Sequence, residues 1–276
     1  MRTGGRKIVA FSVILLALNY SVATAKENGK SGFGCSTQMR VERLEGSYRS
    51  WDANDRFSNS EFGFGLGCFY RFGRFSLDGG AEITVGDLFI THEDQSIDLT
   101  LYAPQQSPRG WFGLTVSVLK RLDIGAHARY RVIPETELEI TDLWVKYWGG
   151  TGFDFTSLGK KHVVVHGSLQ ILEAGGNVSF KVSNWLSTSL DVMWQRYSLD
   201  LEANLDAYAQ NILKAYGGYL EDVVDVGADA DFVLFTPEVT ACPFSRVCAS
   251  VSMPLAIMGE DRWLRGVSLT LSAPLF

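Results

Sequence analysis

Apolar and polar residues alternate along many stretches of this chain, which is the pattern of β-strands with two different faces. Every second residue is apolar between Leu122 and Val132, and again between Val247 and Ile257. Such stretches extend over about 10–13 residues, whereas strands of globular proteins usually have roughly 5–6 residues and tilted membrane strands roughly 9–11. The second face holds small residues and scattered charges, as the lumen of a narrow barrel does. The pattern therefore predicts an antiparallel β-barrel that spans a membrane.

Twelve segments of this kind predict one all-β domain, a single antiparallel transmembrane β-barrel of about twelve strands, with ten and fourteen as the neighbouring even counts. An even number of strands places both termini on the same side of the membrane. The predicted strands are 36–49, 60–71, 74–85, 109–119, 122–132, 139–147, 161–172, 175–184, 187–198, 230–242, 246–257 and 263–275.

The predicted connections differ between the two sides of the barrel. Mostly tight turns are expected on the side of the termini, and long acidic loops at 50–59, 86–108 and 199–229 on the other side. Outer-membrane barrels have this arrangement, with short periplasmic turns and longer outer loops. Two connections fit less well, because 148–160 is a long turn on the short-turn side and 173–176 is a tight turn on the long-loop side.

The N-terminus has the three parts of a secretory signal peptide. A basic start precedes an apolar run over 8–18 and a small-residue site at 23–25. The apolar run is too short to span a bilayer, which takes roughly 20 helical residues. We therefore expect residues 1–25 to be removed and residues 26–276 to form the barrel, with a retained N-terminal anchor helix as the alternative.

Charge and hydropathy exclude several function classes. Removal of the signal peptide takes away three of the 25 basic residues and none of the 31 acidic ones, so the net charge becomes about −9. A nucleic-acid partner would require basic patches, so we expect none. No later stretch approaches the roughly 18 consecutive apolar residues of a transmembrane helix. The alternative to a membrane barrel is a soluble exported β-rich protein that binds a ligand.

Four cysteines follow the signal peptide, and an even number in an exported protein indicates disulfides. Cys242 and Cys248 lie symmetrically about Ser245, so on a hairpin they would face each other, and we expect them to pair. Cys35 and Cys68 would then form the second disulfide. The spacing matches neither a metal site nor a CxxC redox pair, so no metal and no cofactor is expected.

Together these features resemble the Gram-negative outer-membrane β-barrel class, although no specific family is identified. The chain also ends in an aromatic residue, Phe276, after an alternating strand that begins at Val267. The resemblance implies a location in the bacterial outer membrane. It also implies contact with outer-membrane lipid and lipopolysaccharide, and assembly by the barrel-assembly machinery.

Charged residues at inward positions form the main candidate site. Positive and negative charges are nearly balanced, so they could pair in a buried network that fills a narrow barrel, or line a pore that orients solutes. The leading hypothesis is a non-enzymatic outer-membrane barrel, either a narrow porin-like channel or a structural barrel. The predicted lumen residues are Asp78, Glu82, Asp123, Arg129, Arg131, Lys181 and Asp191.

The pair His166 and Ser168 suggests a second hypothesis. It resembles the His-x-Ser pair of outer-membrane lipid hydrolases, in which the histidine is the base and the serine the nucleophile. Positions i and i+2 share a strand face, and alternation points both side chains into the lumen, away from lipid. We therefore expect no catalytic residues and keep a lipid-modifying hydrolase as an alternative. The neighbours that alternation directs toward lipid are Val163, Val165, Leu169 and Ile171.

The predicted loop 199–229 contains apolar residues at helical spacing, which indicates an amphipathic helix interrupted at 217–218. Such a helix could cover the barrel mouth as a lid, or pack on the rim without a gating role. Carboxylates in this loop and directly after it suggest either a Ca²⁺ site or a solvated acidic loop, and the EF-hand spacing is absent. The apolar positions are Leu205, Tyr208, Ile212, Tyr216, Leu220 and Val223, and the carboxylates are Glu221, Asp222, Asp225, Asp229 and Asp231.

Overall fold

The computed structural model describes residues 32–49, 53–95, 97–146, 152–215, 223–244, 247–257 and 262–275. The predicted signal peptide and Phe276 lie outside these ranges. Within them, no helix is long and apolar enough to cross a membrane.

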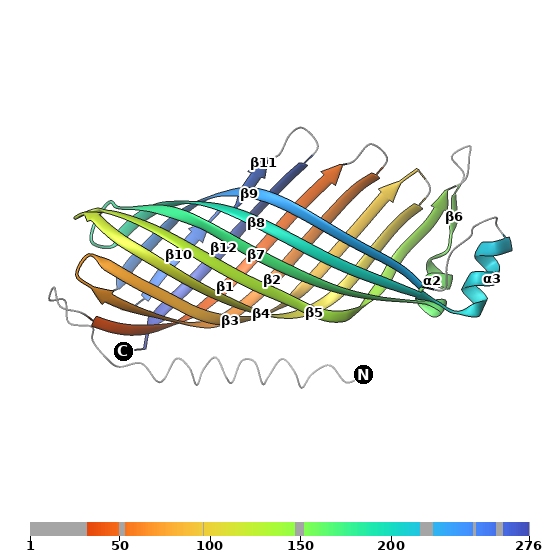
Figure 1. Cartoon of the computed structure of the whole chain (residues 1–276), viewed down its shortest axis with the longest axis horizontal. Helices are drawn as coiled ribbons and strands as arrows, with labels where there is room; N and C mark the ends of the chain where they lie inside the picture. Colours follow the sequence, from red (N-terminus) through yellow and green to blue (C-terminus); the bar gives the residue numbers. More distant parts are fainter. Residues whose placement is uncertain are drawn as a thin grey trace.

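Antiparallel strands curve into a closed ring, because the first and last strands, β1 and β12, pair over thirteen registered positions (Figure 1). Around the ring, β10 and β11 share one position between β9 and β12, and β6 pairs with β5 off the ring. The twelve strands of the sheet therefore fill ten ring positions. The strands are β1 (Gly32–Arg49), β2 (Ala53–Phe72), β3 (Phe75–Asp94), β4 (Ile97–Leu119), β5 (Leu122–Lys146), β6 (Gly152–Asp154), β7 (Val163–Lys181), β8 (Leu186–Leu205), β9 (Val223–Phe244), β10 (Val247–Ser252), β11 (Leu255–Ile257) and β12 (Arg262–Pro274), and the helices are α2 (Thr156–His162) and α3 (Ala207–Ala215).

Two of the predicted strand boundaries are wrong. Strand β5 runs without a break through the predicted strands 122–132 and 139–147, and β7 runs through 161–172 and 175–184. The predicted tight turn at 173–176 does not exist. Because β5 and β7 each replace two predicted strands, the connection 148–160 lies on the side of α2 and α3, where long connections are expected. Both connections that fitted poorly are thereby explained.

The predicted loops 50–59 and 86–108 are also wrong, since most of these residues belong to strands. Strands β8 and β9 likewise extend far into the predicted loop 199–229. Strands on the ring positions other than β10–β11 and β12 have 18–25 residues, whereas crossing a bilayer takes roughly 9–11. The strands therefore continue well beyond the membrane on the side of α2 and α3.

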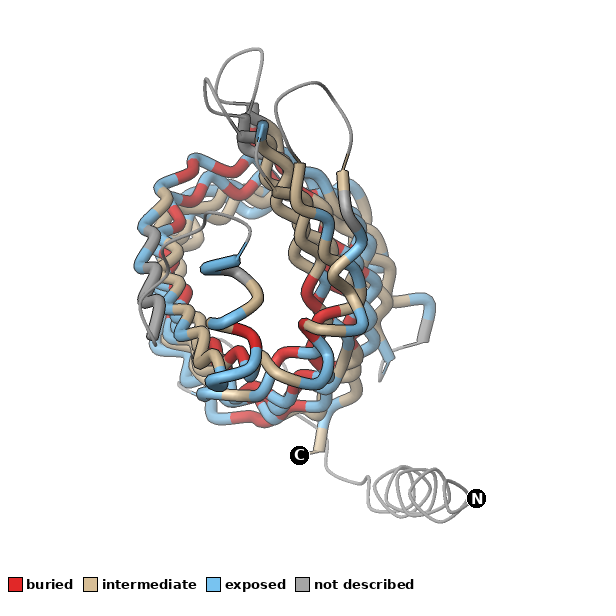
Figure 2. Tube along the Cα trace, turned by 90° about the vertical axis from the view of Figure 1, so that its right-hand side faces the viewer, coloured by how far each residue is buried: buried red, intermediate tan, exposed pale blue. Residues whose placement is uncertain are grey.

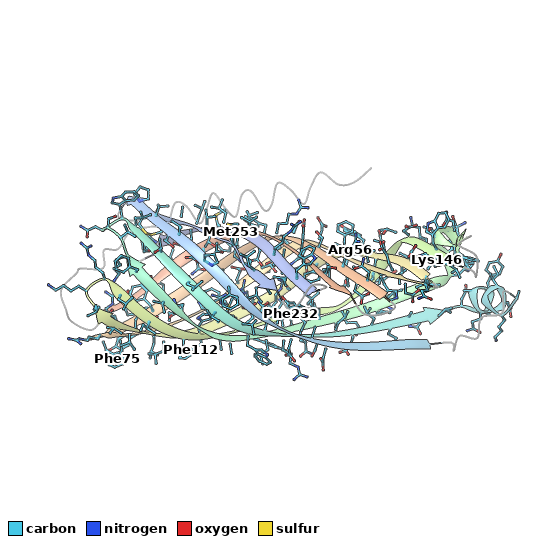
Figure 3. All side chains as sticks on the ribbon, turned by 90° about the horizontal axis from the view of Figure 1, so that it is seen from above. Arg56, Phe75, Phe112, Lys146, Phe232 and Met253 are labelled. Carbon is cyan, nitrogen blue, oxygen red and sulfur yellow. A yellow bond between two sulfur atoms is a disulfide. The ribbon has the colours of Figure 1, made fainter. Side chains whose placement is uncertain are left out.

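The outer surface shows where the membrane lies. Near the short turns, outward side chains are apolar and exposed, as at Phe75, Phe112 and Met253 (Figure 3). Exposed apolar side chains of this kind need lipid around them. The belt includes Val41, Ile83, Val85, Leu114, Ile124, Leu172, Val178, Leu190, Val192, Val233, Phe235, Val239, Val251, Val267, Leu269 and Leu271.

Beyond this belt the pattern is inverted, with polar residues outside and apolar residues inside. The outer surface faces water at this level, so apolar side chains are buried in the lumen. They form a first apolar cluster on β3, β4, β5 and β7 and a second on β1, β9, β11 and β12. The first consists of Leu88, Leu101, Ala103, Ile133, Leu138, Ile140 and Val165, and the second of Leu44, Phe232, Leu234, Ala256 and Leu264.

Both predicted disulfides are present. Cys35 and Cys68 occupy facing positions on β1 and β2, with their Cα atoms 4.0 Å apart. Cys242 and Cys248 join β9 to β10 across the turn, with a Cα separation of 4.1 Å.

Candidate functional site

A layer of paired charges crosses the lumen. Arg40 on β1 contacts Glu61 on β2 at 2.6 Å and Glu82 on β3 at 2.7 Å. Arg131 on β5 contacts the other oxygen of Glu61 at 2.5 Å. Because β2 and β5 lie three positions apart in the ring of ten, this last contact crosses part of the lumen in front of β3 and β4.

Arg109 on β4 extends the layer to Glu173 on β7, at 3.5 Å. Gln195 donates a further hydrogen bond to Glu173 from β8. We call Arg40, Glu61, Glu82, Arg109, Arg131 and Glu173 the ion layer. Its three arginines and three glutamates balance in charge, and their side chains are only 0–14% exposed. Charges buried this deeply are tolerated when each has a partner.

The ion layer lies on β1–β5 and β7, between two differently lined parts of the lumen, and a smaller cavity of about 70 Å³ adjoins it on the side of β9–β12. On the side of the short turns lies a polar cavity of about 400 Å³. On the other side lie the two apolar clusters. A solute that crossed the barrel would have to pass the cavity, the ion layer and the apolar level in turn.

The predicted lumen residues occupy three levels. Arg131 belongs to the ion layer, while Asp123 and Lys181 form an ion pair of 3.1 Å near the short turns. The remaining four line the polar cavity, and Glu82 also joins the ion layer. These four are Asp78, Glu82, Arg129 and Asp191.

Sequence reasoning missed four members of the ion layer. Glu173 was assigned to a turn that does not exist, and Arg109 lies at the edge of a predicted loop. The period of two continues through 171–177, which would have shown that Glu173 shares the face of Asn177. Arg40 and Glu61 lie in predicted strands, but only the charged partners across the ring reveal their role.

His166 and Ser168 point outward, so their predicted lumenal orientation is wrong. Val165 and Ile171 are buried inside, at 5% and 6% exposure, whereas Leu172 is 43% exposed on the outside. The apolar phase of β7 switches at Ile171 and Leu172, because the strand leaves the membrane there. Within the described part of the chain, no hydrogen bond joins His166 to Ser168.

Helix α3 forms within the predicted loop and lies at the mouth opposite the short turns, inside the outline of the ring (Figure 2). Asp206 caps it by accepting the backbone N–H groups of Tyr208 and Ala209, and it also contacts Nδ1 of His162 at 2.7 Å. The Ala209 N–H, followed by His162, lowers the pKa of Asp206. The helix therefore has a definite anchor at the rim.

Asp229 and Asp231, the candidate Ca²⁺ ligands whose side chains the structure describes, are not gathered into a metal site. Asp229 binds Arg196 and Ser198, and the described residues contain no cluster of three metal-ligating side chains. Residues 221–222 and the side chain of Asp225 lie outside the described part of the chain.

His92 lies on β3 beyond the apolar belt and holds two carboxylates. Its Nδ1 is 2.6 Å from Asp55 and its Nε2 is 3.3 Å from Asp94. Burial disfavours the imidazolium, but the hydrogen bonds to Asp55 and Asp94 outweigh this effect, so the pKa of His92 is raised.

This arrangement predicts a pH dependence of stability. A raised folded-state pKa stabilises the fold fully below the unfolded value of about 6.5, and the contribution is lost as the pH rises through the folded-state value. Since the His92 side chain is 35% exposed, we expect less than about 1 kcal/mol. Urea unfolding of the refolded barrel on both sides of this range measures it. Asp55→Asn should reduce the difference, and an identical difference in that variant would contradict the assignment.

The sequence matches no family model, and no curated protein matches it. The structure is similar to that of the outer-membrane protease OmpT from Escherichia coli, with a TM-score of 0.55 and 5% identity over 91% of this chain and 97% of that chain. The translocator domain of the autotransporter NalP from Neisseria meningitidis aligns with a TM-score of 0.45 and 7% identity, over 97% of this chain and 95% of that one. At such identity the likeness to OmpT shows the fold alone.

The closed ring, the apolar belt and this likeness define the class: the chain is a bacterial outer-membrane β-barrel.

Proposed function

We propose that this protein is a non-enzymatic outer-membrane barrel whose lumen is closed, so that it acts as a structural barrel rather than as an open pore. The ion layer is the observation that supports this proposal most strongly. Its contacts bridge strands that are not neighbours in the ring, and Glu61, which binds two of its arginines, has a fully buried side chain. An open pore would leave such charges hydrated. Outer-membrane lipid and lipopolysaccharide would surround the belt, and the barrel-assembly machinery would insert it.

Conductance in planar bilayers tests the proposal. We expect the purified wild-type barrel to be silent and the double variant Glu61→Ala/Arg131→Ala to conduct, because it removes both partners of the contact that crosses part of the lumen. The control is Arg43→Ala/Glu45→Ala, which removes a partly exposed pair on the outer face and should stay silent. Steady wild-type channels would contradict closure, and a silent double variant would contradict the role of the ion layer.

A narrow channel is the second candidate, and the polar cavity favours it. The same recordings decide between the two, since a narrow channel would show small, steady conductance in the wild type. A hydrolase at His166 and Ser168 is the third. It predicts phospholipase activity that Ser168→Ala abolishes.

A further inference from the structure

The polar cavity has an unusual lining for a space that only holds water. It occupies about 400 Å³ between the ion layer and the short turns, within the range of roughly 300–1,000 Å³ that small-ligand pockets have. It is lined almost entirely by polar side chains, and Trp111 is the one aromatic residue among those that line it.

Two buried polar atoms on one wall lack a hydrogen-bond partner among the described residues. These atoms are Oδ1 of Asp191 and Oγ1 of Thr236, whereas Nε2 of His127 lies 3.2 Å from the other carboxylate oxygen of Asp191. Asp191 and Thr236 are only 9% exposed, and they face each other on β8 and β9. Leaving such groups unsatisfied costs about 1–3 kcal/mol each, so a bound molecule that supplies partners would be favoured.

The neighbouring charges also retain hydrogen-bonding capacity. Arg129 approaches Asp191 at 3.5 Å and Glu173 at 3.6 Å, both long for a charge-assisted hydrogen bond. Asp78 has no ion-pair partner in the described part of the chain. It lies on the same level as His127, separated from it by Gly113, where a Cβ would come within 2.7 Å of the Asp78 carboxylate.

The same wall continues beyond β9 as a row of hydroxyl groups on β10 and β12. The strands pair Ser250 with Thr270 and Ser252 with Ser268, and Ser272 continues the row. A hydroxyl both donates and accepts hydrogen bonds. This wall therefore suits a ligand that also presents hydroxyl groups.

Trp111 provides an apolar surface beside these groups. It packs against the wall where β2 and β3 have glycines, since a Cβ on Gly80 would lie 2.3 Å from the indole and one on Gly67 3.2 Å from it. Sugar rings have apolar C–H faces that pack on an indole, while their hydroxyls bind carboxylates, arginine and serine.

We propose that the cavity binds a small neutral polyhydroxylated solute, of the size of a mono- or disaccharide, from the side of the short turns. The charge of the lining excludes anions. Arg40 and Arg109 are neutralised within the ion layer, and the remaining cation, Arg129, faces an excess of carboxylates from Asp78, Asp191 and Glu238. This binding role goes beyond the proposed closed barrel and does not depend on conduction.

Isothermal titration calorimetry tests the proposal on the full mature chain, refolded in an amine-oxide detergent because sugar detergents would compete. The probes are glucose and maltose, with glucose 6-phosphate and glycine for comparison. We expect at least one neutral sugar to bind, and the phosphate and glycine not to. Asp191→Asn and Trp111→Leu should each weaken binding at least about tenfold. The control, Trp185→Leu, removes an exposed tryptophan at a short turn and should bind as the wild type does.

Absence of heat from both neutral sugars up to their solubility limits would overturn the proposal, and so would binding that Asp191→Asn leaves unchanged. Binding of glycine alone would overturn the polyol assignment in favour of a zwitterion. Heat-modifiable electrophoretic mobility shows that each variant is folded, and Thr236→Val replaces any variant that is not.

Discussion

Replacing Glu61 by Gln is expected to destabilise the barrel by about 3–5 kcal/mol, because it removes one partner of a buried ion network and leaves the other charges uncompensated. The Glu61 side chain is fully buried and binds Arg40, Arg131 and Asn59. A glutamine keeps the size and loses the charge, so the change isolates electrostatics from packing. Urea unfolding of the refolded barrel, followed by electrophoretic mobility, measures the effect.

Glu45→Gln is the matched control. Glu45 also binds two arginines, Arg43 and Arg265, but on the outer face where water screens the pair. An exposed pair contributes up to about 1 kcal/mol. Equal destabilisation by the two variants would show that the ion layer is hydrated and the lumen open. The double variant Glu61→Ala/Arg131→Ala should be more stable than Glu61→Ala alone, because the single variant leaves the buried Arg131 without its carboxylate partner.

Leu234→Ala is expected to destabilise the barrel by about 2–5 kcal/mol, because it leaves a cavity in the second apolar cluster. Leu234 is 2% exposed and packs within the lumen beyond the ion layer. The comparison is Leu119→Ala at a short turn, where the side chain is 64% exposed and the change should stay within about 0.5 kcal/mol. The same unfolding measurement applies.

A small loss of stability in Leu234→Ala would mean that water fills the lumen beyond the ion layer, as in an open pore. The two predictions therefore examine separate levels of the lumen, one held by charge and one by apolar packing. Loss of stability at both would agree with a closed barrel.

Much of the fold could be predicted from alternation alone. The strands near the short turns, the even ring and both disulfides follow from period two and from cysteine spacing. Inside the membrane the outside is apolar and the lumen polar, so one rule assigns every side chain in that half. His166 and Ser168 show where the rule fails, because beyond the membrane water lies outside and the apolar face of β7 turns inward.

The candidate site was less predictable. Asp78, Arg129 and Asp191 could be assigned to the lumen from their strands, whereas Glu173 was assigned to a tight turn at 173–176. In the structure β7 continues through these residues. Only the neighbouring strands show that the ladder continues there.

By itself the sequence determined that this chain forms an antiparallel barrel with an apolar exterior. Whether a side chain prefers lipid or water is a local property, and apolar side chains recur at every second position. The tertiary structure decided how far the strands rise above the membrane, and which charges meet inside. Those outcomes depend on partners from strands far apart in the chain, as when Arg131 reaches Glu61 across part of the lumen, and no local pattern encodes such a meeting.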